Sequence, residues 1–151
     1  MIESNIYKAP PFLLEKINKI CSLLWQGKKE YEQVANTIAD KDFRSTMLTL
    51  AQESNQYACE LSSQIQTLGG ILPLEKMNEP KLNGKIKTLH NDANKILSFC
   101  NRNEKKVIGA YEEVLNDSFL YEGLRKMIRY QLNEMLCAFM QVKQLSSLKF
   151  H

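Results

Sequence analysis

Hydrophobic residues in the first half of the chain recur at alternating steps of three and four, which is the period of an amphipathic helix. One stripe consists of Leu13, Ile17, Ile20, Leu24, Gly27, Tyr31, Val34 and Ile38, and the next of Phe43, Met47, Leu50, Ser54, Tyr57, Leu61, Ile65 and Leu68. Asp40 or Asp42 can cap the second stripe, and Gly69-Gly70 can end it. The pattern predicts helices over about residues 11–39 and 41–68, which lie antiparallel because their connection is short.

The same period returns in the second half of the chain. Its inward positions are Leu97, Cys100, Glu104, Val107, Tyr111 and Val114, and then Leu124, Ile128, Gln131 or Leu132, Met135, Ala138, Val142 and Leu145. The sequence Asn116-Asp117-Ser118 is typical of a turn and separates the two stripes. We therefore expect helices over about residues 92–116 and 119–148, again as an antiparallel pair.

Residues 69–91, between the two pairs, lack a helical stripe and contain Pro73, Pro80 and Gly84. Such a segment can run the length of a long helix, since an extended chain rises roughly 3.3 Å per residue against about 1.5 Å in a helix. Two helical hairpins joined by this crossover form an all-α, ferritin-like four-helix bundle, which we predict as a single domain over residues 1–151. The alternative is an up-down-up-down bundle in which this segment is only a long loop.

Composition agrees with a helical domain and excludes several classes of protein. The 151 residues include only six glycines and four prolines, few for a turn-rich β fold, and the net charge of +3 is too small for a nucleic-acid partner. Without a transmembrane stretch or a signal-peptide core, we expect a cytoplasmic protein with no membrane partner. The two histidines exclude a histidine-rich metal site, and the four cysteines lie too far apart for a recognisable zinc or redox motif.

A polar layer interrupts the hydrophobic stripes midway along the predicted helices. Counting outward from the two turns, four core positions lie at about the same height: Gly27, Ser54, Glu104 and Gln131. Three inward-facing tyrosines lie just beyond this height. The predicted buried polar layer therefore consists of Glu104, Tyr31, Tyr57, Tyr111 and Gln131.

Two residues of this layer are unusual for their positions. Glu104 occupies a core position between Cys100 and Val107, where an isolated carboxylate is unfavourable. It can be hydrogen-bonded to tyrosine hydroxyls or to Gln131, it can bind a metal ion or transfer a proton, or it can face solvent. Gly27, inside a long helix, indicates either close helix packing or space for a neighbouring side chain or ligand.

A set of positions spans three of the predicted helices: Gly27 with Tyr31, the helix end Leu68-Gly69-Gly70, and Glu104 followed by Tyr111. This set resembles a bacterial ferritin-like family of four-helix-bundle proteins that is known only as a domain of unknown function. The resemblance covers about residues 13–145. It implies a ferritin-like fold, and it implies no established activity.

The wider ferritin-like class also provides a pattern for a metal centre. Its di-iron members place one Glu on each of two helices and a Glu-x-x-His motif on each of the other two. The carboxylates at the matching positions are Glu30, Glu53, Glu104 and Glu134, which are the candidate metal ligands. Both histidines are missing, and glutamine is a poor substitute for imidazole toward iron. We therefore expect no cofactor, with a looser carboxylate site for iron or manganese as the alternative.

The sequence contains no nucleophile elbow, no phosphate-binding loop and no Ser/His/Asp set, and no residue is assigned a catalytic role. We expect a non-catalytic binding or stress-related interaction module, where the stress-related role follows only by analogy with the ferritin-like class. One alternative is a metal-binding protein or an oxidoreductase that uses the four carboxylates. Another is a subunit that associates with itself or with a protein partner through its outer helix faces.

Overall fold

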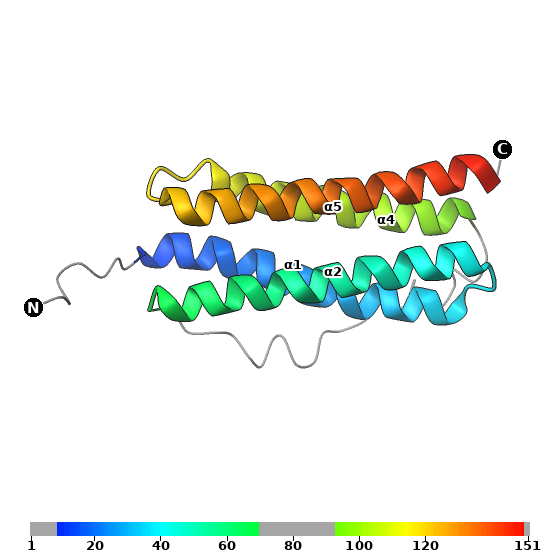
Figure 1. Cartoon of the computed structure of the whole chain (residues 1–151), viewed down its shortest axis with the longest axis horizontal. Coiled ribbons are helices and arrows are strands. Elements are labelled where there is room, and N and C mark those ends of the chain that lie inside the picture. The colour runs from blue at the N-terminus through cyan, green and yellow to red at the C-terminus, as the bar shows by residue number, and fades with distance from the viewer. Residues whose placement is uncertain (1–8, 70–92, 150–151) are drawn as a thin grey trace, which may run out of the picture.

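The computed structural model describes residues 9–69 and 93–149, and these residues form four α-helices with no strand among them (Figure 1). The helices are α1 (Pro11–Thr37), α2 (Lys41–Thr67), α4 (Ala93–Leu115) and α5 (Glu122–Lys149). The prediction of an all-α fold with four long helices is confirmed. The predicted crossover, apart from Gly69, lies outside the described residues.

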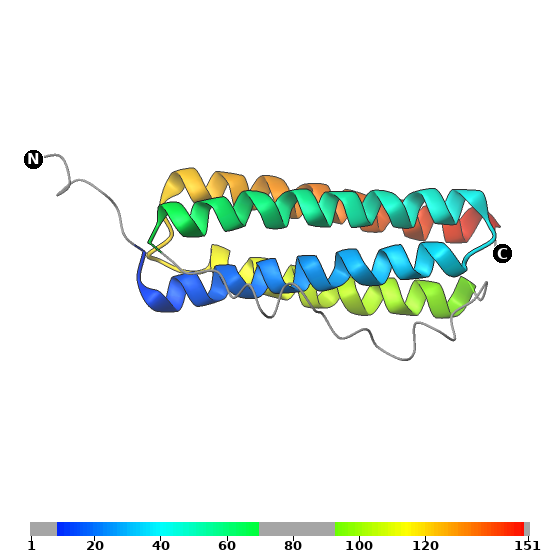
Figure 2. The same cartoon turned by 90° about the horizontal axis from the view of Figure 1, so that it is seen from below.

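The four helices pack as a bundle in which each helix has two neighbours. Helix α1 packs against α2 and α4, and α5 packs against the same two helices, so that α1 lies diagonally opposite α5. Helices α1 and α5 run in one direction, whereas α2 and α4 run in the other (Figures 1 and 2). This excludes the up-down-up-down alternative, in which α2 and α4 would run in opposite directions.

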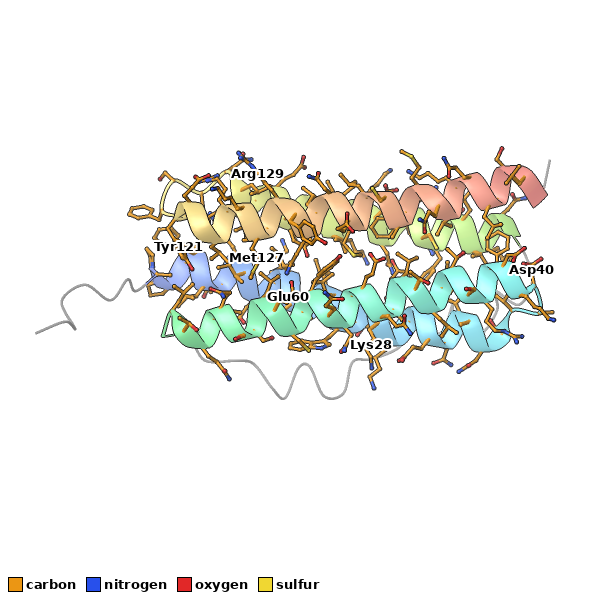
Figure 3. All side chains as sticks on the ribbon, viewed as in Figure 1. Lys28, Asp40, Glu60, Tyr121, Met127 and Arg129 are labelled. Carbon is orange, nitrogen blue, oxygen red and sulfur yellow. The ribbon has the colours of Figure 1, made fainter. Side chains whose placement is uncertain are left out.

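The connection between α1 and α2 is held by side chains that bind backbone groups. The carboxylate of Asp40 accepts hydrogen bonds from two backbone N–H groups at the start of α2, both at 3.0 Å. Figure 3 labels Asp40 at one end of the bundle. The guanidinium of Arg44 donates to the carbonyl of Ile38 at 2.6 Å. Gly69 ends α2 at a φ of +86°, where a residue without a side chain is favoured. The predicted N-cap at Asp40 and the predicted end at Gly69 are confirmed.

The connection between α4 and α5 is longer than predicted, because α5 begins at Glu122 and not near residue 119. Asp117 does not cap the helix directly. Its carboxylate accepts a hydrogen bond from the N–H of Phe119 at 2.8 Å, and its carbonyl accepts one from Leu120 at 3.2 Å. These bonds close a turn of their own, and Arg125 donates to carbonyl groups around it.

The core consists of the predicted stripes, with differences in α4 and α5. All stripe positions of α1 and α2 are buried. At the start of α4, Ile96 and Phe99 are buried while the predicted Leu97 is only half-buried, as is Glu104 further along. In α5, Gln131 and not Leu132 is the buried one of the two alternatives, and Leu145 is only half-buried. No helix in the described part of the chain is both long and apolar enough to cross a membrane.

Candidate functional site

A pocket of about 240 Å³ lies at mid-height of the bundle, between α1 and α4. Its outer wall is formed by exposed or half-buried residues of these two helices. Its inner wall reaches the core and consists of six buried residues: Leu24, Gly27, Tyr31, Ser54, Val107 and Met135. The pocket therefore extends from the surface to the polar layer predicted from the sequence, and all four helices contribute to it.

Gly27 creates part of this space. A Cβ atom at Gly27 would lie 3.4 Å from Cε2 of Tyr31, one turn along the same helix, and would meet no side chain of another helix within 4 Å. Close packing between helices therefore does not explain this glycine. Of the two interpretations of the sequence, the structure favours the one in which Gly27 leaves space for another group.

The phenol of Tyr31 borders the pocket and carries an unsatisfied hydroxyl. Tyr31 is 1% exposed, its ring packs edge-on against Phe99, and its hydroxyl has no hydrogen-bond partner among the described residues. Burial is the main reason why the pKa of Tyr31 lies well above its usual value, and the nearby Cys100 and Glu30 add to the shift. The side chain of Asn103 opposes the shift because it lies close to the hydroxyl, although the two groups do not meet the geometry of a hydrogen bond. The hydroxyl is therefore a protonated donor, and leaving such a group unpaired costs about 1–3 kcal/mol.

The charged residues of the pocket lie at its mouth. Glu30 is half-buried and accepts a long hydrogen bond of 3.5 Å from the amide of Asn103, whereas Lys106 is exposed. Neither Glu30 nor Lys106 forms an ion pair with a residue that the structure describes. Sequence reasoning missed Asn103 and Lys106, because nothing in their spacing distinguishes them from solvent-facing positions of the same helix.

Three of the five predicted polar-layer residues meet on the other side of the bundle. The hydroxyl of Tyr111 donates to Oε1 of Gln131 at 2.9 Å, and Nε2 of Gln131 lies 3.4 Å from the carbonyl of Tyr57. The same Nε2 donates to Oε1 of Glu60 at 2.9 Å, and Figure 3 labels Glu60 on α2. Glu60 was not predicted, although it lies three residues after Tyr57 and hence on the same helix face.

Glu104 does not join this network. Its side chain is 14% exposed, and its Oε1 forms an ion pair with Nζ of Lys143 on α5 at 2.9 Å. The interpretation in which Glu104 bonds to tyrosines or to Gln131 is therefore wrong. The carboxylate lies at the edge of the core, where the long side chain of Lys143 reaches it.

The four candidate metal ligands do not converge. Glu30 lies at the α1–α4 interface, Glu104 pairs with Lys143, and Glu53 and Glu134 lie near one another on α2 and α5. Among the described residues, no group of three or more His, Cys, Asp or Glu side chains is placed to hold a metal ion. The side chains of the described residues thus do not fit a di-iron-type centre, which corrects the four-carboxylate hypothesis.

Glu53 and Glu134 form a pair of like charges next to Tyr57. Oε2 of Glu53 is buried without a hydrogen-bond partner. Burial, and secondarily the charge of Glu134, raises the pKa of Glu53 above 4.5. Burial and the same two carboxylates also raise the pKa of Tyr57. This cluster is therefore less favourable at neutral pH than at acidic pH.

Glu53→Gln is expected to stabilise the fold at neutral pH by a few tenths of a kcal/mol, because it removes a partly desolvated charge and, secondarily, the repulsion from Glu134. The raised pKa means that the folded state holds the proton more tightly than the unfolded chain, so stability falls as the pH rises through the folded pKa. The gain should disappear near pH 4, where the carboxyl is protonated. Urea unfolding at both pH values tests this, with Glu112→Gln on the exposed face of α4 as the control. An equal gain at both pH values would contradict the explanation.

Comparison with known families adds one finding. A sequence model of the family described as "Domain of unknown function (DUF2383)" matches residues 13–117, more than half of the chain. The chain belongs to this family. No curated protein matches it. In this DUF2383 protein the matched region covers α1, α2 and α4, and therefore includes Gly27, Tyr31 and Ser54 of the pocket wall, whereas Met135 lies beyond it.

The space at Gly27 leads to a prediction for the stability of the DUF2383 protein. Gly27→Ala should raise the free energy of unfolding by about 0.5–1 kcal/mol, because alanine is the better helix former and its Cβ makes only an ordinary contact with Tyr31. Gly109→Ala, at an exposed position of α4 with no side chain within 4 Å, is the matched control and should gain a similar amount. Urea unfolding checks both variants. Destabilisation by Gly27→Ala alone would show that packing requires the glycine.

Proposed function

We propose that this DUF2383 protein is a non-catalytic binding module that takes a small organic molecule into the pocket between α1 and α4. The observation that carries the proposal is the combination at Gly27 and Tyr31. A helix-interior glycine that no other helix requires keeps space open, at a cost of about 1 kcal/mol relative to alanine. Next to this space, a buried hydroxyl lacks a partner. A bound molecule would fill the space at Gly27 and form a hydrogen bond with the hydroxyl of Tyr31.

We also propose that the bundle is ferritin-like. The diagonal placement of α1 opposite α5 and the shared direction of α2 and α4 support this, because two helical hairpins joined by one long crossover give that arrangement. A stress-related role in the bacterial cytoplasm is an extension of the proposal by analogy with this class, and it rests on the class alone.

The binding proposal can be tested with protein labelled with ¹⁵N at glycine. The amide of Gly27 reports on the pocket, and that of Gly109 on an open surface of α4. We would add four single-ring probes, phenol, toluene, benzylamine and benzoate, separately at millimolar concentration. Saturable shifts of the Gly27 signal with any one of them, without shifts at Gly109, are expected. No shift at Gly27 with all four would contradict the proposal.

Metal binding is the competing function. The observation in its favour is that Oε2 of Glu53 is buried near Glu134 without a hydrogen-bond partner. Because the described carboxylates do not converge on one point, we expect no stoichiometric iron or manganese. Elemental analysis of protein purified without a polyhistidine tag tests this. Near-stoichiometric metal that is lost in Glu104→Ala or Glu53→Gln would favour the competing function.

A further inference from the structure

We propose that the pocket selects neutral single-ring molecules that carry a hydroxyl group, with phenol as the simplest member. This inference rests on the proposed function, that the pocket between α1 and α4 binds a small organic molecule. It adds the size, the shape and the charge of that molecule. The size follows from the volume of the pocket, and the apolar shape, the hydroxyl group and the charge follow from the residues of its wall.

The size of the ligand follows from the volume. An apolar protein cavity of about 150 Å³ holds one benzene molecule, whereas sites for drug-sized ligands begin at about 300 Å³. The pocket has a volume of about 240 Å³, between these values. It therefore fits one ring with a few additional atoms and is too small for most nucleotides or extended cofactors.

The flat, apolar character of the ligand follows from the inner wall. Leu24, Val107 and Met135 contribute apolar groups, and all three are at most 6% exposed. The missing side chain at Gly27 opens the space directly beside the ring of Tyr31, with Cε2 only 3.4 Å from the ideal Cβ position. An aromatic ring placed there can pack against the tyrosine in an offset or edge-to-face manner.

The hydroxyl group of the ligand follows from the polar atoms of the inner wall. Tyr31 presents a hydroxyl that has no partner among the described residues, and burial keeps it protonated. Ser54, which is 1% exposed, adds a second hydroxyl to the same wall. A ligand hydroxyl can accept a hydrogen bond from Tyr31, whereas a hydrocarbon leaves Tyr31 unsatisfied.

The neutral charge of the ligand follows from the distribution of charged residues. The inner wall carries none, and the charged residues of the pocket are Glu30 and Lys106, of opposite sign, at the mouth. A charged head group in the inner part of the pocket would lose hydration without gaining a counter-ion. At the mouth, each sign of charge meets one attractive and one repulsive side chain.

Binding constants from the Gly27 titration test the inference in wild-type protein and in Tyr31→Phe. Phenol should bind about tenfold more tightly than toluene in wild type, the value of one neutral hydrogen bond, and more tightly than benzylamine or benzoate. Tyr31→Phe keeps the ring and removes the unsatisfied hydroxyl, so the variant should fold at least as stably, and the preference for phenol over toluene should fall severalfold. Tyr130→Phe, at a 59% exposed tyrosine of α5, is the matched control and should leave the preference unchanged.

The outcomes separate this inference from the proposed function. Equal affinity for phenol and toluene in wild type, or an unchanged preference in Tyr31→Phe, overturns the role of the hydroxyl. If benzylamine or benzoate binds at Gly27 more tightly than phenol, the inferred preference for neutral molecules is overturned, while the pocket remains a binding site. The absence of any shift at Gly27 overturns both the inference and the proposed function.

Discussion

Gln131→Leu is expected to lower the free energy of unfolding by about 2 kcal/mol. Gln131 and Tyr111 are each 0% exposed, and the amide of Gln131 is the acceptor for the Tyr111 hydroxyl at 2.9 Å. Leucine has a similar size and leaves little cavity, but it cannot accept this bond. The tyrosine hydroxyl is then buried without a partner, at a cost of about 1–3 kcal/mol, and Glu60 loses a donor at 2.9 Å.

A double variant tests this explanation, because removing both partners of a buried hydrogen bond costs less than removing one. Tyr111→Phe combined with Gln131→Leu should be about 1 kcal/mol more stable than Gln131→Leu alone. Urea unfolding followed by circular dichroism measures all four members of the cycle. If the two substitutions are additive, the hydrogen bond between Tyr111 and Gln131 does not contribute as described.

Asp117→Ala is expected to lower the free energy of unfolding by about 2 kcal/mol, because one carboxylate fixes the α4–α5 turn and ties it to α1. Its side chain is 3% exposed, forms an ion pair with Lys16 at 2.9 Å, and accepts a hydrogen bond from the N–H of Phe119 at 2.8 Å. Loss of a cap of this kind typically costs about 1 kcal/mol, and loss of a largely buried ion-pair partner adds to it. Asp117→Asn retains an acceptor for Phe119 and should lose less.

The charge of Asp117 also predicts a pH dependence. Burial by itself would raise the pKa of Asp117, but the hydrogen bonds from Lys16 and Phe119 and the charges of Lys16 and Arg125 outweigh it, so the pKa lies below 3.8. The stability that this carboxylate contributes is therefore present above the unfolded pKa and is lost as the pH falls through the folded pKa. The difference between wild type and Asp117→Asn should be constant near pH 7 and should shrink below about pH 4. A difference that does not depend on pH would contradict this assignment.

The helices were predictable because their signals are local or periodic. The stripe from Leu13 to Ile38 and the cap at Asp40 need only the spacing of residues within one segment. The start of α5 was not predictable to the residue, since from the sequence alone the carboxylate of Asp117 can either cap a helix or close a separate turn. Lys16, which is distant in sequence, binds this carboxylate only in the folded protein.

The candidate site was predictable only in part. Counting from the turns placed Gly27, Ser54, Glu104 and Gln131 at one level, and of these only Gly27 and Ser54 line the same pocket. Gln131 bonds to Tyr111, about two turns from Glu104 along α4, and Glu104 pairs instead with Lys143. Which neighbour each residue contacts depends on the rotation of its helix by a fraction of a turn and on the reach of side chains such as Lys143. A pocket is harder still to predict, because it is defined by missing side chains on several helices, and Gly27 was the one local signal for it.

The matched glycine pair tests whether the space at Gly27 is a binding pocket. Leucine at either helix position favours the helix relative to glycine, but only at Gly27 does the side chain extend toward the pocket. We predict that Gly27→Leu abolishes saturable binding of phenol, whereas Gly109→Leu binds phenol as wild type does, with circular dichroism showing both variants folded. Unchanged affinity of Gly27→Leu for phenol would contradict binding in this pocket.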